Sequence, residues 1–159
     1  MDTISKKQRS RNMSHIRSKN TMPELLVRSI LHRMGFRFRL HDRSLPGCPD
    51  IVLKRWKTVV FVNGCFWHRH EGCQYAYVPK TRRSFWSKKF AGNVRRDAEH
   101  AAALRFLGWR IKVVWECELR HPRTVKNRFK RVCHPIAGVT SSLRAQSSSP
   151  QAERSRFTV

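Results

Sequence analysis

A short loop and one distant cysteine form the most informative group of residues in this sequence. Cys65, His70 and Cys73 stand in a C-x4-H-x2-C pattern, and Cys117 can supply a fourth ligand from further along the chain. Thiolates and imidazole at short spacing are the donors of tetrahedral zinc sites, and four protein ligands leave no open position for catalysis. We therefore expect a structural Zn²⁺ site. The alternative is a set of reduced, buried cysteines without metal.

The same loop carries two large aromatic side chains, Phe66 and Trp67, which cannot both point inward easily from so tight a loop. Apolar side chains inserted between base steps unstack DNA, and a mismatch lowers the cost because its pairing is already weakened. The loop therefore predicts a wedge that enters DNA. Trp86 is a candidate for the same role, with helix packing as an equal alternative.

One of the ten carboxylates of the chain, Asp50, stands directly before the apolar residues 51–53. This position puts a carboxylate at the mouth of a buried strand. Mg²⁺ prefers oxygen ligands and keeps several waters, so one carboxylate, one further oxygen and substrate phosphates would suffice to hold it. The alternative is a turn aspartate that begins a strand or pairs with an arginine.

Restriction-type nucleases carry a Pro-Asp at such a strand start and an acidic-x-Lys triplet on the next strand. Here the matching stretch of the next strand, residues 62–64, holds no acid and no lysine. The carbonyl oxygen of Val62 remains as a hard ligand for Mg²⁺. His68 is the nearest candidate for the general base, because a filled zinc site leaves it free, with Glu24 and Asn63 as candidate orienting groups.

The composition indicates a polyanionic partner. The 159-residue chain carries a formal net charge of +24, and a folded domain so basic repels itself unless a polyanion neutralises it. Nucleic acid is the expected partner, whereas no basic amphipathic anchor or lipidation motif favours a membrane. Neither a membrane-spanning apolar run nor a signal peptide is evident. We expect a cytoplasmic, nucleoid-associated monomer.

The elements that must position these residues follow from capping signals and periodicity. Thr21 and Glu24 form a capping-box pattern at the start of a helix whose apolar face is Leu25, Leu26, Ile30 and Met34, and Gly35 ends it. Alternation predicts a strand over 36–40, and apolar runs predict strands over 50–53 and 58–62. The last run is continuously apolar, as in a central strand.

A long helix is predicted for residues 84–107, with Trp86, Phe90, Val94 and Leu104 on its apolar face. Asn93 and Asp97 fall on or beside that face. A strand over 110–115 and a basic helix over 121–132 complete the order α-β-β-β-α-β-α. This order predicts an α/β fold in which helices flank a small mixed sheet.

Three segments of different composition divide the chain. Residues 1–20 are a basic arm, in which Met13 and Ile16 are candidate apolar contacts to DNA. A disordered tail is the alternative for this arm. Residues 21–136 form the folded domain, and the Ser-rich residues 137–159 are expected to be disordered.

Several separated motifs, in the right order, resemble those of one known family. They are RNMSHI (11–16), LPGCPD (45–50), FVNGCFWH (61–68), NVRRD (93–97), LGWR (107–110) and VWEC (114–117). Together they resemble the very short patch repair (Vsr) endonucleases, from about residue 8 to about residue 133. The resemblance implies a Mg²⁺-dependent endonuclease of restriction-endonuclease-like fold. It also implies nicking 5′ to the thymine of a T·G mismatch that arises by 5-methylcytosine deamination, alongside a cytosine-5 DNA methyltransferase.

Carried over motif by motif, the resemblance implies a role for each candidate residue. The best-known members have a histidine, a proposed proton acceptor, where this chain has Asn63. The catalytic residues are Asp50, His68, Glu24 and Asn63, with Asp50 and the Val62 carbonyl on Mg²⁺. Structural Zn²⁺ is held by Cys65, His70, Cys73 and Cys117, and DNA is contacted by Met13, Ile16, Phe66, Trp67, Trp86, Asn93 and Asp97.

Two other functions compete with this one. The first is a zinc-stabilised protein that binds distorted DNA without cleaving it. Asp50 discriminates against it, because pure binding needs no carboxylate facing phosphate. The second is a basic RNA-binding protein, which is disfavoured because no RNA-binding motif is present.

Overall fold

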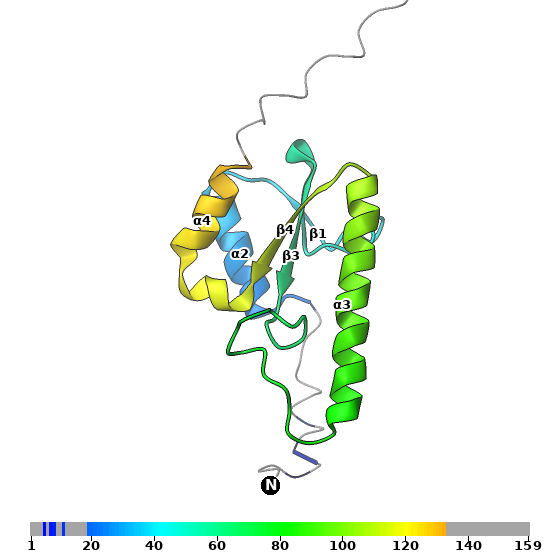
Figure 1. Cartoon of the computed structure of the whole chain (residues 1–159). Coiled ribbons are helices and arrows are strands. Elements are labelled where there is room, and N and C mark those ends of the chain that lie inside the picture. Colours follow the sequence, from blue (N-terminus) through cyan, green and yellow to red (C-terminus); the bar gives the residue numbers. More distant parts are fainter. Residues whose placement is uncertain (1–4, 6, 9–10, 12–18, 133–159) are drawn as a thin grey trace, which may run out of the picture.

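The computed structural model describes residues 5, 7–8, 11 and 19–132. Within them the chain forms a four-stranded mixed sheet in the order β1-β2-β3-β4, flanked by helices (Figure 1). The strands are β1 (Arg39–Leu40), β2 (Ile51–Leu53), β3 (Thr58–Asn63) and β4 (Arg110–Trp115). The predicted α/β class and mixed sheet are confirmed. Met13, Ile16 and the segment 137–159 lie outside the described residues, so their roles stay predictions.

The strand pairing decides which loops meet. β1, β2 and β3 pair antiparallel, whereas β3 and β4 run parallel, with Asn63 opposite Trp115 at their ends. Cys65 and Cys117 each follow two residues after that last pair. The parallel register therefore delivers the two cysteines to the same edge of the sheet, although 51 intervening residues separate them in the sequence.

Helices cover both faces of the sheet. α2 (Met22–Arg33) and α4 (Pro122–Lys130) lie on one face and α3 (Arg83–Phe106) on the other (Figure 1). Successive side chains of each strand point to opposite faces of the sheet, as the pleat of a β-strand requires. Ile51 and Val60 pack beneath α2 and α4, whereas Val52 and Val59 pack against Leu104 of α3. The 3-10 turns η1 (Lys54–Trp56) and η2 (Glu116–Arg120) follow β2 and β4.

The strand predicted for residues 36–40 is shorter than expected. The amide of Phe36 donates to the carbonyl of Leu31 at 3.0 Å, so this residue closes α2. Its side chain is buried in the main core, with its ring 4.7 Å from that of Trp56. The alternating pattern therefore reflects the packing of Phe36 and Phe38 against the core, and only Arg39 and Leu40 pair as a strand.

The capping box of α2 is confirmed, but its buried face differs from the predicted one. Thr21 and Glu24 bond each other's backbone groups as expected. Val27 and Leu31 are fully buried, whereas Leu25 and Leu26 are 45% and 47% exposed. Ile30 and Met34 pack against the core as predicted. The prediction was wrong for Leu25 and Leu26, because Glu24, an acid, occupies the core-facing stripe with Val27 and Leu31. Polarity alone would have assigned Glu24 to the surface.

α3 bridges two separate parts of the molecule. Near its start Phe90 is buried among the aromatic rings of the loop after β3, and near its end Leu104 is buried against the sheet. Val94, between them, is 46% exposed, so it does not belong to the predicted apolar face. None of the helices in the described part of the chain has the length and apolar composition needed to cross a membrane.

Candidate active site and metal centres

A cavity of about 760 Å³ lies where β3 ends, between the start of α2 and the middle of α3. All the residues that the sequence suggested for catalysis line it. Glu24 comes from α2, Asp50 precedes β2, Val62 and Asn63 end β3, and His68 comes from the loop that follows. The fold thus gathers the candidate set around one space, and their individual roles stay predictions.

The two carboxylate oxygens of Asp50 have different surroundings. Oδ2 accepts a hydrogen bond from the amide of Val62 at 2.8 Å, and Oδ1 lies 3.9 Å from Nδ1 of His41. Burial raises the pKa of Asp50 above its ordinary value, and the nearby Glu24 adds to this, whereas the Val62 amide opposes it. A buried carboxylate with one weakly engaged oxygen is suited to receive a cation.

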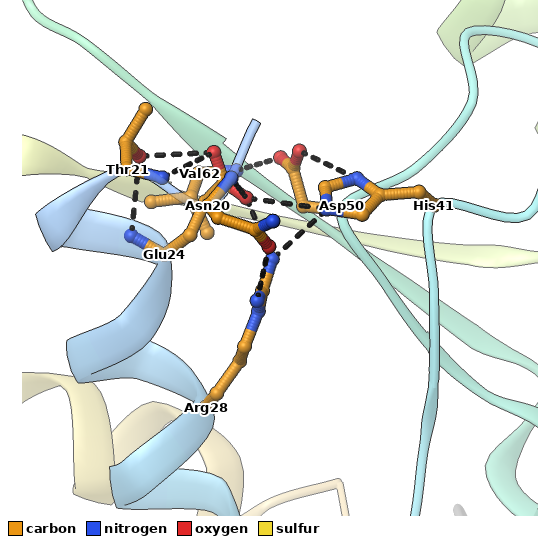
Figure 2. Close-up of polar contacts among 7 residues, drawn as sticks. All are labelled: Asn20, Thr21, Glu24, Arg28, His41, Asp50 and Val62. Atoms are coloured by element: carbon orange, nitrogen blue, oxygen red, sulfur yellow. Dashed lines mark hydrogen bonds and ion pairs between the residues drawn. The ribbon is translucent and has the colours of Figure 1, made fainter. Parts of the chain in front are cut away.

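Glu24 is held by its own helix start. Its carboxylate is almost fully buried and accepts four hydrogen bonds, from the amides of Asn20 and Thr21, the Thr21 hydroxyl and Nη2 of Arg28 (Figure 2). A carboxylate offers about four lone-pair sites, so these donors saturate it. Glu24 therefore fixes the geometry of this region and has no free oxygen to offer a metal ion.

Sequence reasoning missed His41, whose Nε2 lies 3.5 Å from Oε2 of Glu24 and whose Nδ1 lies 3.9 Å from Oδ1 of Asp50 (Figure 2). The ligand atoms of these three residues are all within 4.8 Å of one another. His41 follows β1 directly, and its amide faces the carbonyl of Asp50 at 3.4 Å, one step beyond the pair of Leu40 and Ile51. Only the antiparallel register of β1 and β2 brings His41 to Asp50, and no local pattern in the sequence indicates that register.

His68 is oriented by a residue of α3. Its Nδ1 lies 2.6 Å from Oδ2 of Asp97, and both side chains are about one-third exposed. Because a carboxylate accepts, the proton of a neutral imidazole resides on Nδ1, which leaves Nε2 with a lone pair. Nε2 has no hydrogen-bond partner among the described residues. This geometry is that of an oriented acid or base.

Asn93, the other polar candidate of α3, ties the helix to the loop after β3. Its Nδ2 donates to the carbonyl of Trp67 at 2.9 Å, and its Oδ1 accepts from Arg96. The sequence suggested DNA contacts for both Asn93 and Asp97. In the described structure their polar groups bond within the protein, where they position Trp67 and His68.

The four predicted zinc ligands form a compact cluster. Nδ1 of His70 lies 3.6 Å from Sγ of Cys65 and 3.3 Å from Sγ of Cys117, and Cys73 completes the group. With usual Zn–S and Zn–N bond lengths, the sulfur–nitrogen edge of a tetrahedral site is roughly 3.5 Å. Burial raises the pKa of the Cys65 thiol to about 12. Such a thiol needs a cation to hold it as a thiolate.

The aromatic residues of the loop form one cluster with the start of α3. The ring of Phe66 lies 5.0–5.3 Å from the rings of Trp67, Tyr77, Trp86 and Phe90. Phe66 is therefore the centre of the cluster, and both Trp67 and Trp86 are partly exposed beside it. Trp67 also lines the cavity. The cluster thus adjoins the candidate catalytic residues.

Basic side chains surround the mouth of the cavity. Lys19, Lys89 and Arg96 line it together with the acids. A polyanion that enters would meet these cations within a partly enclosed space, where charges attract more strongly than in open water. The electrostatics therefore suit a phosphate-bearing substrate.

Comparisons with known proteins agree with this site. The family model described as DNA mismatch endonuclease Vsr matches residues 1–74. The Type II nicking enzyme V.XorIIP of Xanthomonas oryzae is 47% identical over 134 residues, covering 84% of this chain and 98% of that protein. The Type II nicking enzyme V.NmeAIP of Neisseria meningitidis is 42% identical over 135 residues, covering 85% and 96%.

A third relative is the DNA mismatch endonuclease Vsr of Escherichia coli. It is 44% identical over 119 residues, which cover 75% of this chain and 76% of that protein. Identity of this level over three quarters of the chain agrees with the matched family model and with the cavity built from the same motifs. The chain therefore belongs to the Vsr family of DNA mismatch endonucleases, which act in DNA repair.

Proposed function

We propose that this protein is a Mg²⁺-dependent endonuclease that nicks DNA 5′ to the thymine of a T·G mismatch produced by 5-methylcytosine deamination. The observation that carries the proposal is a single cavity that holds Asp50, the end of β3 and the His68–Asp97 pair beside an aromatic cluster. Membership of a mismatch endonuclease family supports the same activity.

The donors around Asp50 fit Mg²⁺. Asp50 Oδ1 and the carbonyl oxygen of Val62 are hard ligands, and the Val62 amide already holds the other carboxylate oxygen at 2.8 Å. When bound, the ion would polarise the scissile phosphate and promote ionisation of a water. Two protein oxygens leave most of the coordination to water and phosphate, as Mg²⁺ prefers. Asn63, nearly buried beside Val62, also lines the cavity.

His68 handles the proton in this proposal. The Asp97 carboxylate holds its Nδ1–H, so that Nε2 can accept a proton from the attacking water or return one to the leaving oxygen. Asp97 is then a positioning residue rather than the DNA contact that the sequence suggested. Glu24 likewise acts by position, since its oxygens are saturated by the cap of α2 and by Arg28.

Mismatch recognition is assigned to the aromatic cluster. Trp67 and Trp86, supported by Phe66, would enter the base stack at the mispair, where unstacking costs least. The cluster of Cys65, His70, Cys73 and Cys117 would hold a structural Zn²⁺ that fixes this loop. The basic arm, with Met13 and Ile16, would add contacts on the duplex.

Further parts of the proposal rest on the family resemblance. The fold is restriction-endonuclease-like, the protein acts as a monomer at the nucleoid, and a cytosine-5 DNA methyltransferase creates the sites whose deamination the enzyme repairs. The division into an arm (1–20), a domain (21–136) and a tail (137–159) rests on composition and stays a prediction.

The test uses end-labelled duplexes that differ at one base pair, T·G or T·A, incubated with the purified protein and Mg²⁺. We expect one nick, 5′ to the mispaired thymine, in the T·G duplex alone and none when EDTA replaces Mg²⁺. Binding of the T·G duplex without any cleavage would overturn the proposal in favour of a zinc-stabilised protein that recognises distorted DNA.

A further inference from the structure

One residue outside the family motifs lies beside Asp50. Val62 holds only Oδ2 of Asp50, and Nδ1 of His41 lies 3.9 Å from Oδ1. The His41 side chain is 15% exposed and that of Asp50 20%, so water competes little for this contact. His41 is therefore placed to influence the rotation of the Asp50 carboxylate about its own bond.

Arg28 determines which nitrogen of His41 carries the proton. Nη2 of Arg28 lies 3.0 Å from Nε2 of His41, and a guanidinium can only donate. Nε2 must therefore accept, and the proton of the neutral imidazole is on Nδ1, the nitrogen that faces Asp50 (Figure 2). His41 thus presents a donor to Asp50 and an acceptor to Arg28.

Arg28 is itself held in place at the start of α2. The same Nη2 donates to Oε2 of Glu24 at 2.7 Å, and Nη1 donates to Oδ1 of Asn20 at 2.7 Å. Glu24 is fixed in turn by the helix cap. A continuous series of contacts therefore runs from residue 20, at the end of the basic arm, to Asp50.

The backbone of His41 is also constrained to this position. Its φ is 48°, in the left-handed region that a non-glycine residue adopts rarely. The amide of His41 faces the carbonyl of Asp50 across the β1–β2 pair. Residues held in such rarely populated backbone conformations cluster at functional sites. His41 is one of them and lies beside a candidate metal ligand.

We propose that His41, oriented by Arg28, is a positioning residue that holds the Asp50 carboxylate in the rotation needed to bind the catalytic metal ion. The inference rests on the proposed function, because it concerns the same cation site. His41 touches neither metal nor substrate in this role. Its Nδ1–H faces Oδ1 of Asp50 at 3.9 Å, a polar contact longer than a hydrogen bond, and it restricts the carboxylate so that little ordering remains when the ion arrives.

A second role would use the same atoms differently. If Nε2 donated to Glu24, 3.5 Å away, Nδ1 would be free to bind the metal as a nitrogen ligand. The short contact to Arg28 opposes that tautomer, because two donors would then face each other at 3.0 Å. The two roles differ in whether an imidazole nitrogen is bonded to the ion. A directly bound imidazole would give a ¹⁴N coupling in the pulsed electron paramagnetic resonance spectrum of bound Mn²⁺, whereas a positioning residue would not. Glutamine supplies N–H donors and a carbonyl acceptor, so it can replace the polar contacts of His41.

The experiment compares His41→Gln and His41→Leu with the wild-type chain. Mn²⁺ binding to the DNA-free protein is measured by electron paramagnetic resonance, and nicking of the T·G duplex is measured under single-turnover conditions with Mg²⁺. We expect His41→Leu to weaken Mn²⁺ binding and slow nicking by about 10-fold to 100-fold, the usual effect of removing a partner that orients a metal ligand. His41→Gln should stay within about 3-fold of wild type in both measurements, an effect well below that range.

The control variant is His32→Leu, which makes the same replacement at an exposed position of α2. It should leave both measurements unchanged. Melting curves and zinc content show whether each variant is folded. Arg28→Lys, which keeps a charge beside Glu24, should slow nicking, and its effect should be less than additive with that of His41→Leu.

Each outcome decides the proposal. Wild-type Mn²⁺ affinity and nicking in His41→Leu would overturn it. Equal losses in His41→Gln and His41→Leu would also overturn it, because glutamine keeps the polar groups on which positioning depends. A ¹⁴N coupling to bound Mn²⁺ that His41→Leu removes would overturn it in favour of a metal-ligating imidazole. If the wild-type protein binds Mn²⁺ and His41→Leu weakens that binding, but neither protein nicks the duplex, the proposed function fails while the positioning role stands.

Discussion

Nδ1 of His68 lies 2.6 Å from Oδ2 of Asp97, across a separation of 29 residues. This contact joins the loop after β3 to the middle of α3, beside the cavity that Asp50 lines. It gives His68 a defined tautomer with Nε2 available for proton transfer. An isolated surface histidine would have no such preference, so the pair is a property of the assembled site.

The first prediction follows from this pair. Asp97→Asn replaces the acceptor by an amide that can present a donor to Nδ1, which would favour the wrong tautomer. Single-turnover nicking of a T·G duplex should fall by about 10²-fold to 10⁴-fold, the usual contribution of an oriented acid or base, while binding of the duplex is retained. Glu99→Gln, the same chemical change at an exposed position two residues away on α3, should have little effect. Equal losses in the two variants would contradict the assignment.

The second prediction concerns Asp50 and pH. Burial raises the pKa of this carboxyl above the value of 3.8 expected in the unfolded chain. Its favourable contribution to stability is therefore complete below pH 3.8 and is lost as pH rises through the folded-state pKa. At pH 7 the metal-free protein carries a partly buried charge at Asp50 that opposes folding. Asp50→Asn should raise Tm at pH 7, and the gain should shrink as pH falls toward 4.

Asp42 provides a control, because its pKa is shifted in the opposite direction from that of Asp50. Hydrogen bonds from the hydroxyl and amide of Ser44 lower the pKa of Asp42. Its stabilising contribution is therefore present above pH 3.8 and is lost as pH falls through the lower folded-state pKa. Asp42→Asn should lower Tm at pH 7. Calorimetric melts that show both variants shifting in the same direction would contradict the pKa directions. Mg²⁺ should raise Tm in the wild-type chain and not in Asp50→Asn.

The third prediction concerns zinc. Elemental analysis of the purified protein should find one zinc per chain, and Cys73→Ser should lose most of it. Loss of a structural metal is among the few single changes that cost more than about 4 kcal/mol, so the variant should also melt at a much lower temperature. Cys48→Ser makes the same replacement outside the cluster and should retain zinc. A well-folded wild-type protein without zinc would exclude the site.

The fourth prediction separates recognition from chemistry. Trp67→Ala should weaken binding of the T·G duplex by roughly 1–3 kcal/mol, the usual contribution of a base–aromatic stack, and the matched T·A duplex should be affected less. The ratio of the two affinities, measured by fluorescence anisotropy, is the readout. Phe106→Ala, at the other end of α3 and 92% exposed, is the control. A loss that is the same for both duplexes would argue against a wedge at the mispair.

The fifth prediction concerns the cations at the cavity. If Lys89 neutralises one phosphate, Lys89→Gln should make the slope of log K against log salt shallower by about 0.9. Lys54→Gln, in the turn between β2 and β3, removes the same charge away from the cavity and should leave the slope unchanged. Identical slopes for Lys89→Gln and the wild-type chain would show that Lys89 does not neutralise a phosphate of the DNA backbone.

Local signals in the sequence were sufficient for most of the elements and for the chemical types of many candidate site residues. The capping box of Thr21 and Glu24 correctly began α2, and the spacing of Cys65, His70 and Cys73 correctly indicated a cluster. Asp50 was identified because an acid beside an apolar run is conspicuous in so basic a chain. These signals need only neighbours within a few residues, where backbone geometry limits the alternatives.

Contacts between distant segments required the tertiary structure. The pairs His41–Asp50 and His68–Asp97 depend on strand register and on the path of α3, which no short pattern encodes. The buried position of Glu24 was equally hidden, because Arg28 and the helix cap offset the cost of burying an acid only once α2 is packed. Sequence determined which chemical groups the site contains. Their mutual distances were decided by long-range pairing, because a one-residue shift in register would move each side chain to the opposite face of the sheet.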